Sequence, residues 1–337
     1  MAHIAKSLGV SVQTVSAVVN GKPGISLHTQ ERVREAVTRL EYQPNVQART
    51  LRGVKSKTIG VIIPSITNPY FPEFVKGAED AARALGYSMF LCNTDSELRH
   101  LLEYFALIKT NKASGLICSV GISGDWLDDG EVVRWLRQFA NDGVSVVLNG
   151  KASADLPIAS AVVDSDVAIR EAVMHLLHLG HRRVALISPP VGLSVTAERV
   201  AAYRAAFAEF GHPLAEEMIV PGDFDIAVGA AATRDLMRRR QRPTAIIAAN
   251  DLAAFGAISA LTAMGLSVPD DMSVVGFDDI AFAKVFQPAL TTIKQPVYDL
   301  GREALRLATT DTREGTAPEV VTLAASFIAR QSTGPAR

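Results

Sequence analysis

The pattern of hydrophobic and polar positions changes near residue 57. Before it, apolar residues recur at the spacings of short helices, and Ile4, Ala5 and Leu8 form a first stripe that ends at Gly9. After it, short apolar runs alternate with amphipathic stretches, which is typical of strands alternating with helices. The pattern therefore predicts a small helical head followed by an α/β body.

The head is predicted to contain a helix-turn-helix. Ser11 is suited to cap a second helix, in which Val15, Val18 and Val19 share one face. A glycine-containing turn between two short helices, the second of them capped, is the layout of that motif. Ser26 is suited to cap a third helix. The apolar face of this third helix comprises Val33, Ala36, Val37 and Leu40.

The body is predicted to contain two doubly wound parallel-sheet lobes. Helix patterns separate most of the early strands, clearly at 73–85 and 166–179, and the strands exceed what one twisted sheet usually holds. Small ligands bind such sheets beyond the carboxyl ends of the strands. The tail 332–337 is expected to be frayed. The predicted strands are 58–63, 87–92, 115–120, 144–148, 161–163, 184–187, 218–220, 245–248, 273–276, 290–293 and 320–324.

Composition excludes several classes of protein. A hydrophobic content of 48% and a charged content of 20% fit a folded chain rather than a disordered one. No apolar run approaches the roughly 18 residues of a membrane span, and we expect neither a secretory signal nor a membrane partner. Cys92 and Cys118 each lie in an apolar run, which indicates reduced core thiols in a cytoplasmic protein.

The net charge of -1 conceals a division along the chain. Residues 1–57 carry nine basic and three acidic side chains, whereas the remainder carries 25 basic and 32 acidic ones. A basic head on an acidic body is typical of a protein that binds a polyanion through the head.

The second helix of the head carries residue types that can read DNA. Because its valines face inward, Val12, Gln13 and Ser16 are expected to face a partner. Glutamine can bond an adenine edge through two hydrogen bonds, and valine can pack on a thymine methyl. The alternative is a small helical cap with a polar surface. For the segment 44–52, Leu51 is either a wedge for the minor groove or the anchor of a solvated linker.

Polar residues at predicted strand ends are candidate ligand contacts. Asn149, Asn250 and Asp278 each follow a strand, and their side chains can bond hydroxyl groups. Three aromatic residues could stack on a sugar or a base, although ordinary core packing is an equal alternative. These aromatic residues are Tyr70, Phe71 and Phe224.

No metal or cofactor site is expected. His175, His178 and His181 are spaced by three, but Gly180 should end the helix before His181 and no carboxylate or cysteine completes a set of ligands. Surface or capping positions are the preferred interpretation. The sequence contains no Walker loop, Rossmann glycine fingerprint, nucleophile elbow or zinc-protease motif.

The chain resembles the lactose/galactose-repressor (LacI/GalR) family of bacterial transcription regulators along nearly its whole length. Ordered motifs at the expected spacings carry the resemblance. They are Ile4-Ala5-Lys6, Gly9 to Ser16, Val19-Asn20-Gly21, Pro44-Asn45 to Leu51, Thr58 to Ile62, Asn68-Pro69-Tyr70-Phe71, Leu179 to Arg183, Glu198-Arg199, Asn250-Asp251, Val275 to Asp279 and Pro288 to Thr292.

The resemblance implies a mechanism and an organisation. A homodimer would place two recognition helices in successive major grooves of a near-palindromic operator, and paired hinge helices would open the minor groove. A sugar or purine would bind between the lobes. The domains would be a head at 1–43, a hinge and linker at 44–57, and an effector-binding and dimerisation body at 58–337.

The resemblance also implies contact residues. Double-stranded DNA would be contacted by Ser11, Val12, Gln13, Thr14, Ser16, Asn20, Asn45, Ala48 and Leu51. The effector would be contacted by Tyr70, Phe71, Asn149, Arg199, Phe224, Asn250 and Asp278. One departure is Ala17, where the family commonly has an arginine that helps to hold DNA.

A ligand-controlled repressor, not an enzyme, is therefore the predicted function. A solute-binding protein of a transporter would have the same two-lobed body, but it leaves the basic head unexplained. A sugar- or nucleoside-processing enzyme would need a recognisable catalytic motif, and none appears.

Overall fold

The computed structural model describes residues 1–19, 22–40, 56–119, 126, 129–152, 156, 158–310 and 318–337. It divides into two compact units, Met1–Ser56 and Lys57–Arg337. Each unit buries its own apolar core.

The head is built from α1 (Ala2–Leu8), α2 (Val12–Val19) and α3 (Leu27–Arg39). Gly9 ends α1 with a φ of 68°, a left-handed conformation that glycine adopts readily. Ser11 Oγ accepts a hydrogen bond from the backbone N–H of Thr14 at 3.0 Å, so Ser11 caps α2 as predicted. Ser26 caps α3 in the same manner. The core residues of the head are Ile4, Ala5, Val15, Val18, Val33 and Ala36.

The expectation for Leu40 was wrong. This residue follows the last residue of α3 and is exposed, so it does not extend the buried face of the helix. The helix therefore contributes a shorter apolar stripe than its sequence pattern indicates, because the pattern continues past the point where the backbone leaves the helical conformation.

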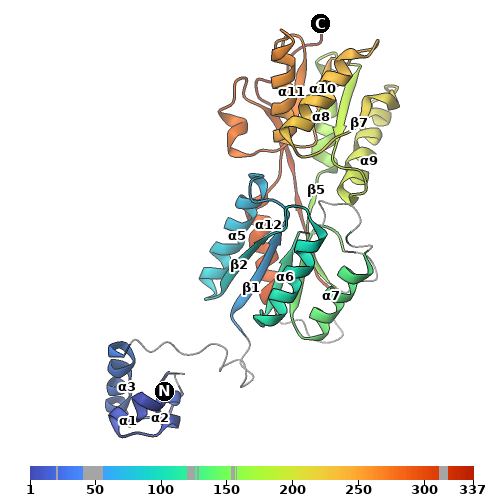
Figure 1. Ribbon diagram of the computed structural model, residues 1–337. Helices are drawn as coiled ribbons and strands as arrows, with labels where there is room; N and C mark the ends of the chain where they lie inside the picture. Colours follow the sequence, from blue (N-terminus) through green and yellow to red (C-terminus); the bar gives the residue numbers. More distant parts are fainter. Residues whose placement is uncertain are drawn as a thin grey trace. The chain divides into compact units, whose positions relative to one another are not determined.

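The first lobe of the body is a parallel sheet of strand order β11-β5-β4-β3-β1-β2. One face packs on α5 and α12, and the other packs on α6 and α7 (Figure 1). The strands are β1 (Thr58–Ile63), β2 (Ser88–Asn93), β3 (Gly115–Cys118), β4 (Ser145–Asn149), β5 (Ala159–Asp164) and β11 (Val320–Ala324). The helices are α5 (Tyr70–Ala84), α6 (Leu98–Thr110), α7 (Gly130–Asn141) and α12 (Val297–Thr309).

The second lobe repeats the arrangement with strand order β12-β10-β9-β8-β6-β7, in which only the β10–β12 pair is antiparallel among the described strands. Helices α10 and α11 cover one face, and α8 and α9 cover the other. The strands are β6 (Val184–Ser188), β7 (Ile219–Pro221), β8 (Ala245–Ile247), β9 (Ser273–Asp278), β10 (Thr291–Lys294) and β12 (Ser326–Ile328). The helices are α8 (Asp166–His178), α9 (Ser194–Glu209), α10 (Ile226–Arg238) and α11 (Asp251–Ala263), with short 3₁₀ turns η1 (Glu216–Met218) and η2 (Ala281–Lys284).

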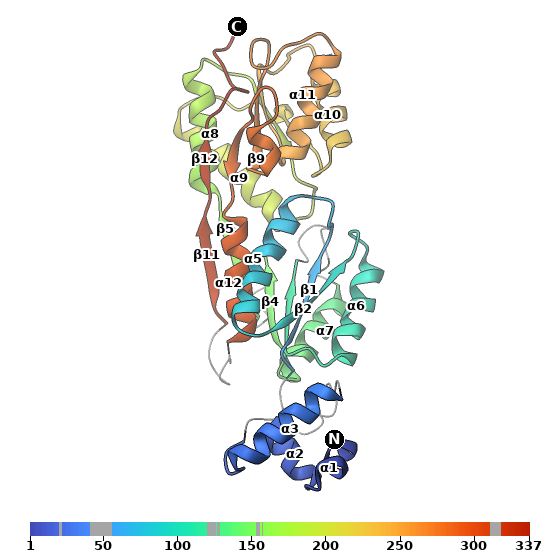
Figure 2. The same ribbon diagram turned by 90° about the vertical axis from the view of Figure 1, so that its left-hand side faces the viewer.

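In the described residues the chain passes between the lobes at three places. It leaves the first lobe after β5, returns to it between β10 and α12, and leaves again at Ala325 between β11 and β12 (Figure 2). The backbone N–H of Ala325 donates to the carbonyl of Asp164 at 2.8 Å, which ties two of these crossings together. Neither lobe is therefore continuous in sequence.

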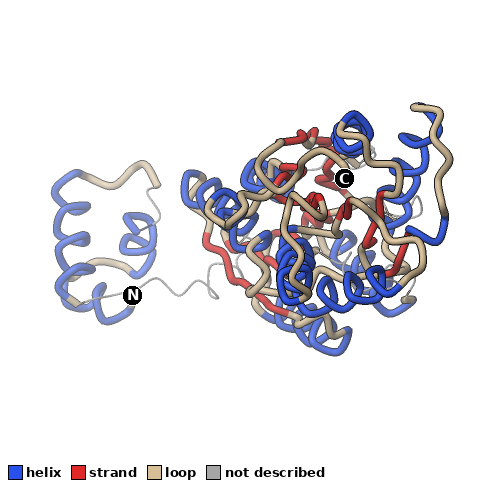
Figure 3. Tube along the Cα trace, turned by 90° about the horizontal axis from the view of Figure 1, so that it is seen from above, coloured by secondary structure: helices blue, strands red, loops and turns tan. Residues whose placement is uncertain are grey.

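The two predicted lobes are confirmed, and seen from above the helices of the body lie outside most of its strands (Figure 3). The strand β12 was not predicted, since Ser326–Ile328 is short and lies directly after β11. Among the described residues no helix is long and apolar enough to cross a membrane.

The prediction of a frayed tail was wrong. Ser332 is fully buried, its backbone accepts from Val274 N–H at 2.8 Å, and Ala336 N–H donates to the carbonyl of Leu179. His181, expected at a surface or capping position, is buried beneath this tail. Its ring contacts Thr244 Oγ1, Ser273 Oγ and the carbonyl of Gly334, each at 2.9 to 3.0 Å. Buried hydrogen bonds thus hold the tail on the second lobe.

Candidate functional site

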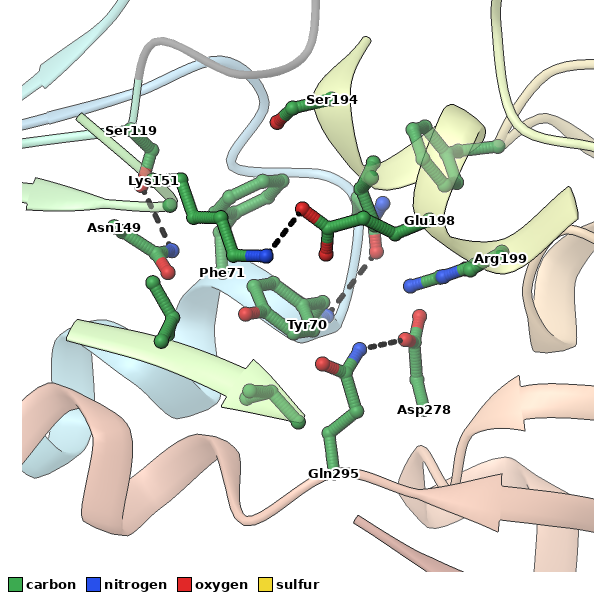
Figure 4. A pocket seen from close by; sticks show the side chains of 16 residues that line it. Tyr70, Phe71, Ser119, Asn149, Lys151, Ser194, Glu198, Arg199, Asp278 and Gln295 are labelled. Atoms are coloured by element: carbon green, nitrogen blue, oxygen red, sulfur yellow. Dashed lines mark hydrogen bonds and ion pairs between the residues drawn. The ribbon is translucent and has the colours of Figure 1, made fainter. Parts of the chain in front are cut away.

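A cleft of about 150 Å³ lies in the body, lined by residues of both lobes (Figure 4). This volume is room for on the order of ten water molecules, or for one small ligand that displaces them. Its polar residues lie at or just after the ends of β3, β4, β9 and β10 and around the starts of α5 and α9. The predicted residues that line it are Tyr70, Phe71, Asn149, Arg199, Phe224 and Asp278.

Arg199 is held from two sides. Its Nη1 donates to the carbonyl of Ala249 at 2.7 Å, and its guanidinium lies 3.5 Å from the ring centroid of Phe277. Burial lowers the pKa of Arg199 to about 10, although Asp278 nearby opposes the change. The group is therefore still charged at neutral pH. Within the described residues its Nε has no hydrogen-bond partner, so the guanidinium is not fully satisfied by the protein.

Asp278 lies at the carboxyl end of β9 with an unusual backbone. Its φ is 115°, which is rare for a residue with a side chain and marks strain of the kind found at binding sites. Gln295 Nε2 donates to Asp278 Oδ1 at 2.7 Å. Burial raises the pKa of Asp278 to about 7, against the opposing effects of Arg199 and the bond from Gln295. The carboxyl group can therefore accept or donate a hydrogen bond near neutral pH.

Asn149 and the aromatic pair form the first-lobe side of the cleft. Asn149 Nδ2 donates to Ser119 Oγ at 3.0 Å, which orients the amide oxygen away from Ser119. Tyr70 and Phe71 meet edge to face with ring centroids 5.0 Å apart. Burial raises the pKa of Tyr70 and Asp278 adds to the rise, so the phenol is a neutral donor or acceptor. Phe71 is buried and belongs to the core as well as to the wall.

Asn250 is the one predicted effector residue that does not line the cleft as described. It is buried, its Oδ1 caps α11 by accepting from Ala253 N–H at 2.8 Å, and its Nδ2 donates to the carbonyl of Phe224 at 3.2 Å. Both the oxygen and the nitrogen of its amide are therefore hydrogen-bonded within the protein. Asn250 therefore holds the backbone of Phe224, and Phe224 does line the cleft.

Sequence reasoning did not assign six charged or polar residues of the cleft to the effector site: Asn68, Ser119, Lys151, Ser194, Glu198 and Gln295. Lys151 and Glu198 form an ion pair at 2.8 Å from the end of the first-lobe strand β4 to the second-lobe helix α9. Gln295 follows β10, so the same strand-end rule that identified Asp278 could have found it. The ion pair had no such signal, because its members meet only when two distant segments pack.

In the head, the start of α2 presents the predicted DNA-reading residues. Ser11, Val12 and Gln13 are exposed, whereas Thr14 and Ser16 are partly buried. Ala17 is partly buried as well. Asn20, Asn45, Ala48 and Leu51 lie outside the described residues, and so does most of the predicted hinge.

The geometry defines a class of protein. A two-lobed α/β body with a ligand-sized cleft between parallel sheets is typical of binding proteins, and the head is a helix-turn-helix. Two family models match the chain: "Bacterial regulatory proteins, lacI family" at residues 1–45 and "Periplasmic binding protein-like domain" at residues 173–333.

Similarity over nearly the full length identifies the family. The chain is 33% identical over 333 residues to the transcriptional regulator DegA of Bacillus subtilis (strain 168), covering 98% of this chain and 97% of DegA. It therefore belongs to the lacI family and is a transcriptional regulator with a DNA-binding and a ligand-binding domain, not an enzyme.

Solved structures agree with this assignment. The lac repressor dimer bound to operator and the anti-inducer ONPF matches with a TM-score of 0.85 and 30% identity over 98% of each chain. A complex of the transcriptional regulator CelR with cellobiose matches with a TM-score of 0.73 and 27% identity, also over 98% of each chain.

Proposed function

We propose that this regulator is a repressor that binds a near-palindromic operator as a homodimer and is controlled by a sugar or sugar derivative in the cleft. The observation that carries the proposal is the joint presence of an exposed α2 start in the head and the Arg199–Asp278 cleft in the body. A protein acting on chromosomal DNA would work in the cytoplasm.

The chemistry of the cleft favours a polyhydroxylated ligand. Asp278 and the amide oxygen of Asn149 can accept from hydroxyl groups, Arg199 can donate to them, and Phe224 offers an aromatic face. A buried carboxyl next to a buried guanidinium suits neighbouring hydroxyls on one ring, because each hydroxyl both donates and accepts. The cellobiose held by CelR supports the same class of ligand.

DNA contact is proposed for the exposed start of α2 and for the hinge. Gln13 and Val12 would read base edges, with Ser11, Thr14, Ser16 and Asn20 positioning the helix. Asn45, Ala48 and Leu51 would act in the minor groove. Basic residues near α2 would neutralise phosphates, although Arg32 also donates to the carbonyl of Leu8 at 3.1 Å and so helps to hold the head together.

Exposed apolar side chains in the second lobe support a dimer. Phe282 is 60% exposed and Val285 is 71% exposed, next to each other around η2. Ile226, at the start of α10, is also exposed. Large apolar side chains gathered on a surface are typical of an interface. The matched lac repressor is described as a dimer on its operator.

Salt-dependent DNA binding and ligand-induced stabilisation test the proposal together. Affinity for duplex DNA should fall steeply between 50 and 200 mM salt, on the order of 10³-fold for about six phosphate contacts. A carbohydrate panel should contain a compound that raises the melting temperature of the wild type but not of Asp278→Ala, which should remain a folded dimer. A shallow salt dependence would contradict phosphate contact, and an equal thermal shift in both proteins would contradict the assigned cleft.

A further inference from the structure

A second cavity of about 490 Å³ adjoins the cleft. We call it the side chamber. Lys151, Val162, Val163 and Glu198 line both cavities, so the two lie side by side and share this part of their walls. The remaining lining residues of the side chamber are Asp164, Ser165, Asp166, Ala201, Ala202, Ala205 and Thr322.

The walls of the side chamber are small and of mixed polarity. On the α9 side, Ala201 and Ala205 are exposed and leave room that larger side chains would occupy. On the opposite side, Thr322 of β11 pairs in register with Val162 of β5. Apolar patches between hydroxyl and carboxylate groups match a sugar ring, which has C–H faces and a hydroxyl rim.

Charge restricts what the side chamber can accept. Three carboxylates and one ammonium line it, those of Asp164, Asp166, Glu198 and Lys151. Asp166 is paired with Arg170 at 2.9 Å, and Lys151 is paired with Glu198. The side chamber therefore presents acceptors rather than spare cations, and an acidic ligand would be repelled.

The Lys151–Glu198 pair belongs to the wall that the two cavities share, and Figure 4 shows the pair at the cleft. Its side chains are 60% and 43% exposed, and an ion pair so open to water is weak. A ligand passing from one cavity to the other can exchange that contact for hydroxyl bonds to the ammonium and to the carboxylate. The pair therefore does not close the side chamber to a longer ligand.

We propose that the side chamber binds the second sugar unit of an uncharged disaccharide or glycoside whose first unit occupies the cleft beside Arg199 and Asp278. The inference rests on the proposed carbohydrate effector and extends it. The incompletely bonded guanidinium of Arg199, which is more than nine-tenths buried, marks the first position. The residues that line both the cleft and the side chamber mark the direction in which the ligand extends.

Calorimetry of the full-length chain with monosaccharide and disaccharide pairs tests the inference. The probes are D-glucose with cellobiose, D-glucose with maltose, and D-galactose with lactose. We expect at least one disaccharide to bind tenfold or more tightly than its own monosaccharide, because the second ring gains contacts in the side chamber.

Filling the side chamber should remove that advantage. Ala201→Phe and Ala205→Phe each place a ring in the chamber from the exposed face of α9, so the affinity ratio should fall to about one while monosaccharide binding persists. Ala208→Phe is the matched control, since Ala208 is exposed on the same helix and does not line the chamber. It should keep the wild-type ratio.

The outcomes separate the inference from the proposed function. A monosaccharide that binds as tightly as its disaccharide, or a ratio that survives both chamber-filling variants, overturns the side chamber and leaves a one-sugar effector standing. If none of these carbohydrates binds the wild type, the side-chamber inference is overturned, and the thermal-shift panel decides separately whether the effector is a carbohydrate.

Discussion

Asp278 departs from the ordinary behaviour of an aspartate in both backbone and side chain. Its φ of 115° is strained, and burial raises its carboxyl pKa to about 7. Both features oppose folding, since the native state holds the residue in a conformation and an environment that it does not prefer. Such a residue is best explained by what it binds.

The free energy of unfolding should fall as the pH rises from about 4 to about 7. The folded carboxyl keeps its proton above the pH at which the unfolded one, with its ordinary value near 3.8, has lost it. Stability from this group is therefore greatest at low pH and is lost through pH 7, by up to about 4 kcal/mol at 1.36 kcal/mol per pKa unit. Asp278→Asn should remove this part of the pH dependence.

Denaturant titration at pH 5 and pH 8 measures the difference. Burial also raises the pKa of Asp251, which acts in the same direction, so the comparison between wild type and Asp278→Asn isolates the residue. Asp299→Asn, exposed at the start of α12, serves as the control and should behave as the wild type does. A variant as pH-sensitive as the wild type would contradict the raised pKa of Asp278.

Gln13→Ala should weaken discrimination between operators more than it weakens binding to random DNA. The side chain is exposed at the start of α2, where a bidentate contact to a base is worth about 1–3 kcal/mol. Competition binding with the cognate operator and with random duplex measures both affinities. An equal loss on the two DNAs would assign Gln13 to phosphate contact or to folding.

At the scale of single residues, the rule that ligands bind at the carboxyl ends of parallel strands predicted more of the cleft than side-chain chemistry did. Asn149 and Asp278 both line the cleft, because a parallel sheet brings the carboxyl ends of its strands to one edge. Asn250 also follows a strand, but in the described structure its amide caps α11 and holds Phe224. His181 was placed at the surface because its burial depends on a tail more than 150 residues further along the chain.

At the scale of elements, the crossing of α5 and α12 depends on two glycines. A Cβ atom added at Gly77 would lie 1.9 Å from the carbonyl oxygen of Tyr298, and one added at Gly301 would lie 2.0 Å from that of Phe74. Both contacts involve backbone atoms, which cannot turn aside. The helices are therefore as close as their backbones allow.

Gly77→Ala should destabilise the body by about 1–3 kcal/mol or more, since the new methyl group forces the two helices apart. Gly130→Ala is the control. It lies at the start of α7, has open space around the added atom and should be neutral or slightly stabilising. Thermal unfolding of both variants gives the comparison, and equal melting temperatures would contradict the tight crossing.

The docked tail makes a second prediction at this scale. Ser332 Oγ accepts from the buried N–H of Thr291 at 2.8 Å and donates to the carbonyl of Val274 at 2.6 Å. Ser332→Ala leaves both backbone groups without that partner and should cost about 1–3 kcal/mol. Hydrogen exchange should show faster exchange at Thr291 in the variant, while protection of the first lobe stays unchanged.

Element positions were predictable because their signals are local. The strands around β1, β6 and β11 and the caps of α2 and α3 follow from apolar runs and from hydroxyl side chains at helix starts. The short strand β12 and the path of the tail were not, since both are set by pairing with β10 and by packing on β9. Such pairings join segments far apart in sequence and leave no periodic pattern.

At the scale of the whole molecule, Val285→Arg should shift a dimer toward monomer and lower operator affinity at least tenfold. A charge in the exposed apolar surface around η2 opposes its burial against a second copy. Val191→Arg, at a comparably exposed position in a loop, is the control. Analytical ultracentrifugation and operator binding give the result, and an unchanged sedimentation coefficient would place the dimer interface elsewhere.

The three crossings between the lobes have a consequence for synthesis on the ribosome. The first lobe begins at residue 58, yet its sheet lacks an edge strand until β11 is made, and the face that α5 covers in part is completed only when α12 arrives. At roughly 5–20 residues per second, roughly 8–30 s separate the end of β5 from the end of β11. During that interval the nascent chain carries an incomplete sheet, one apolar face of which still lacks α12. The lobe that begins first is therefore the one whose apolar surface takes longest to be covered.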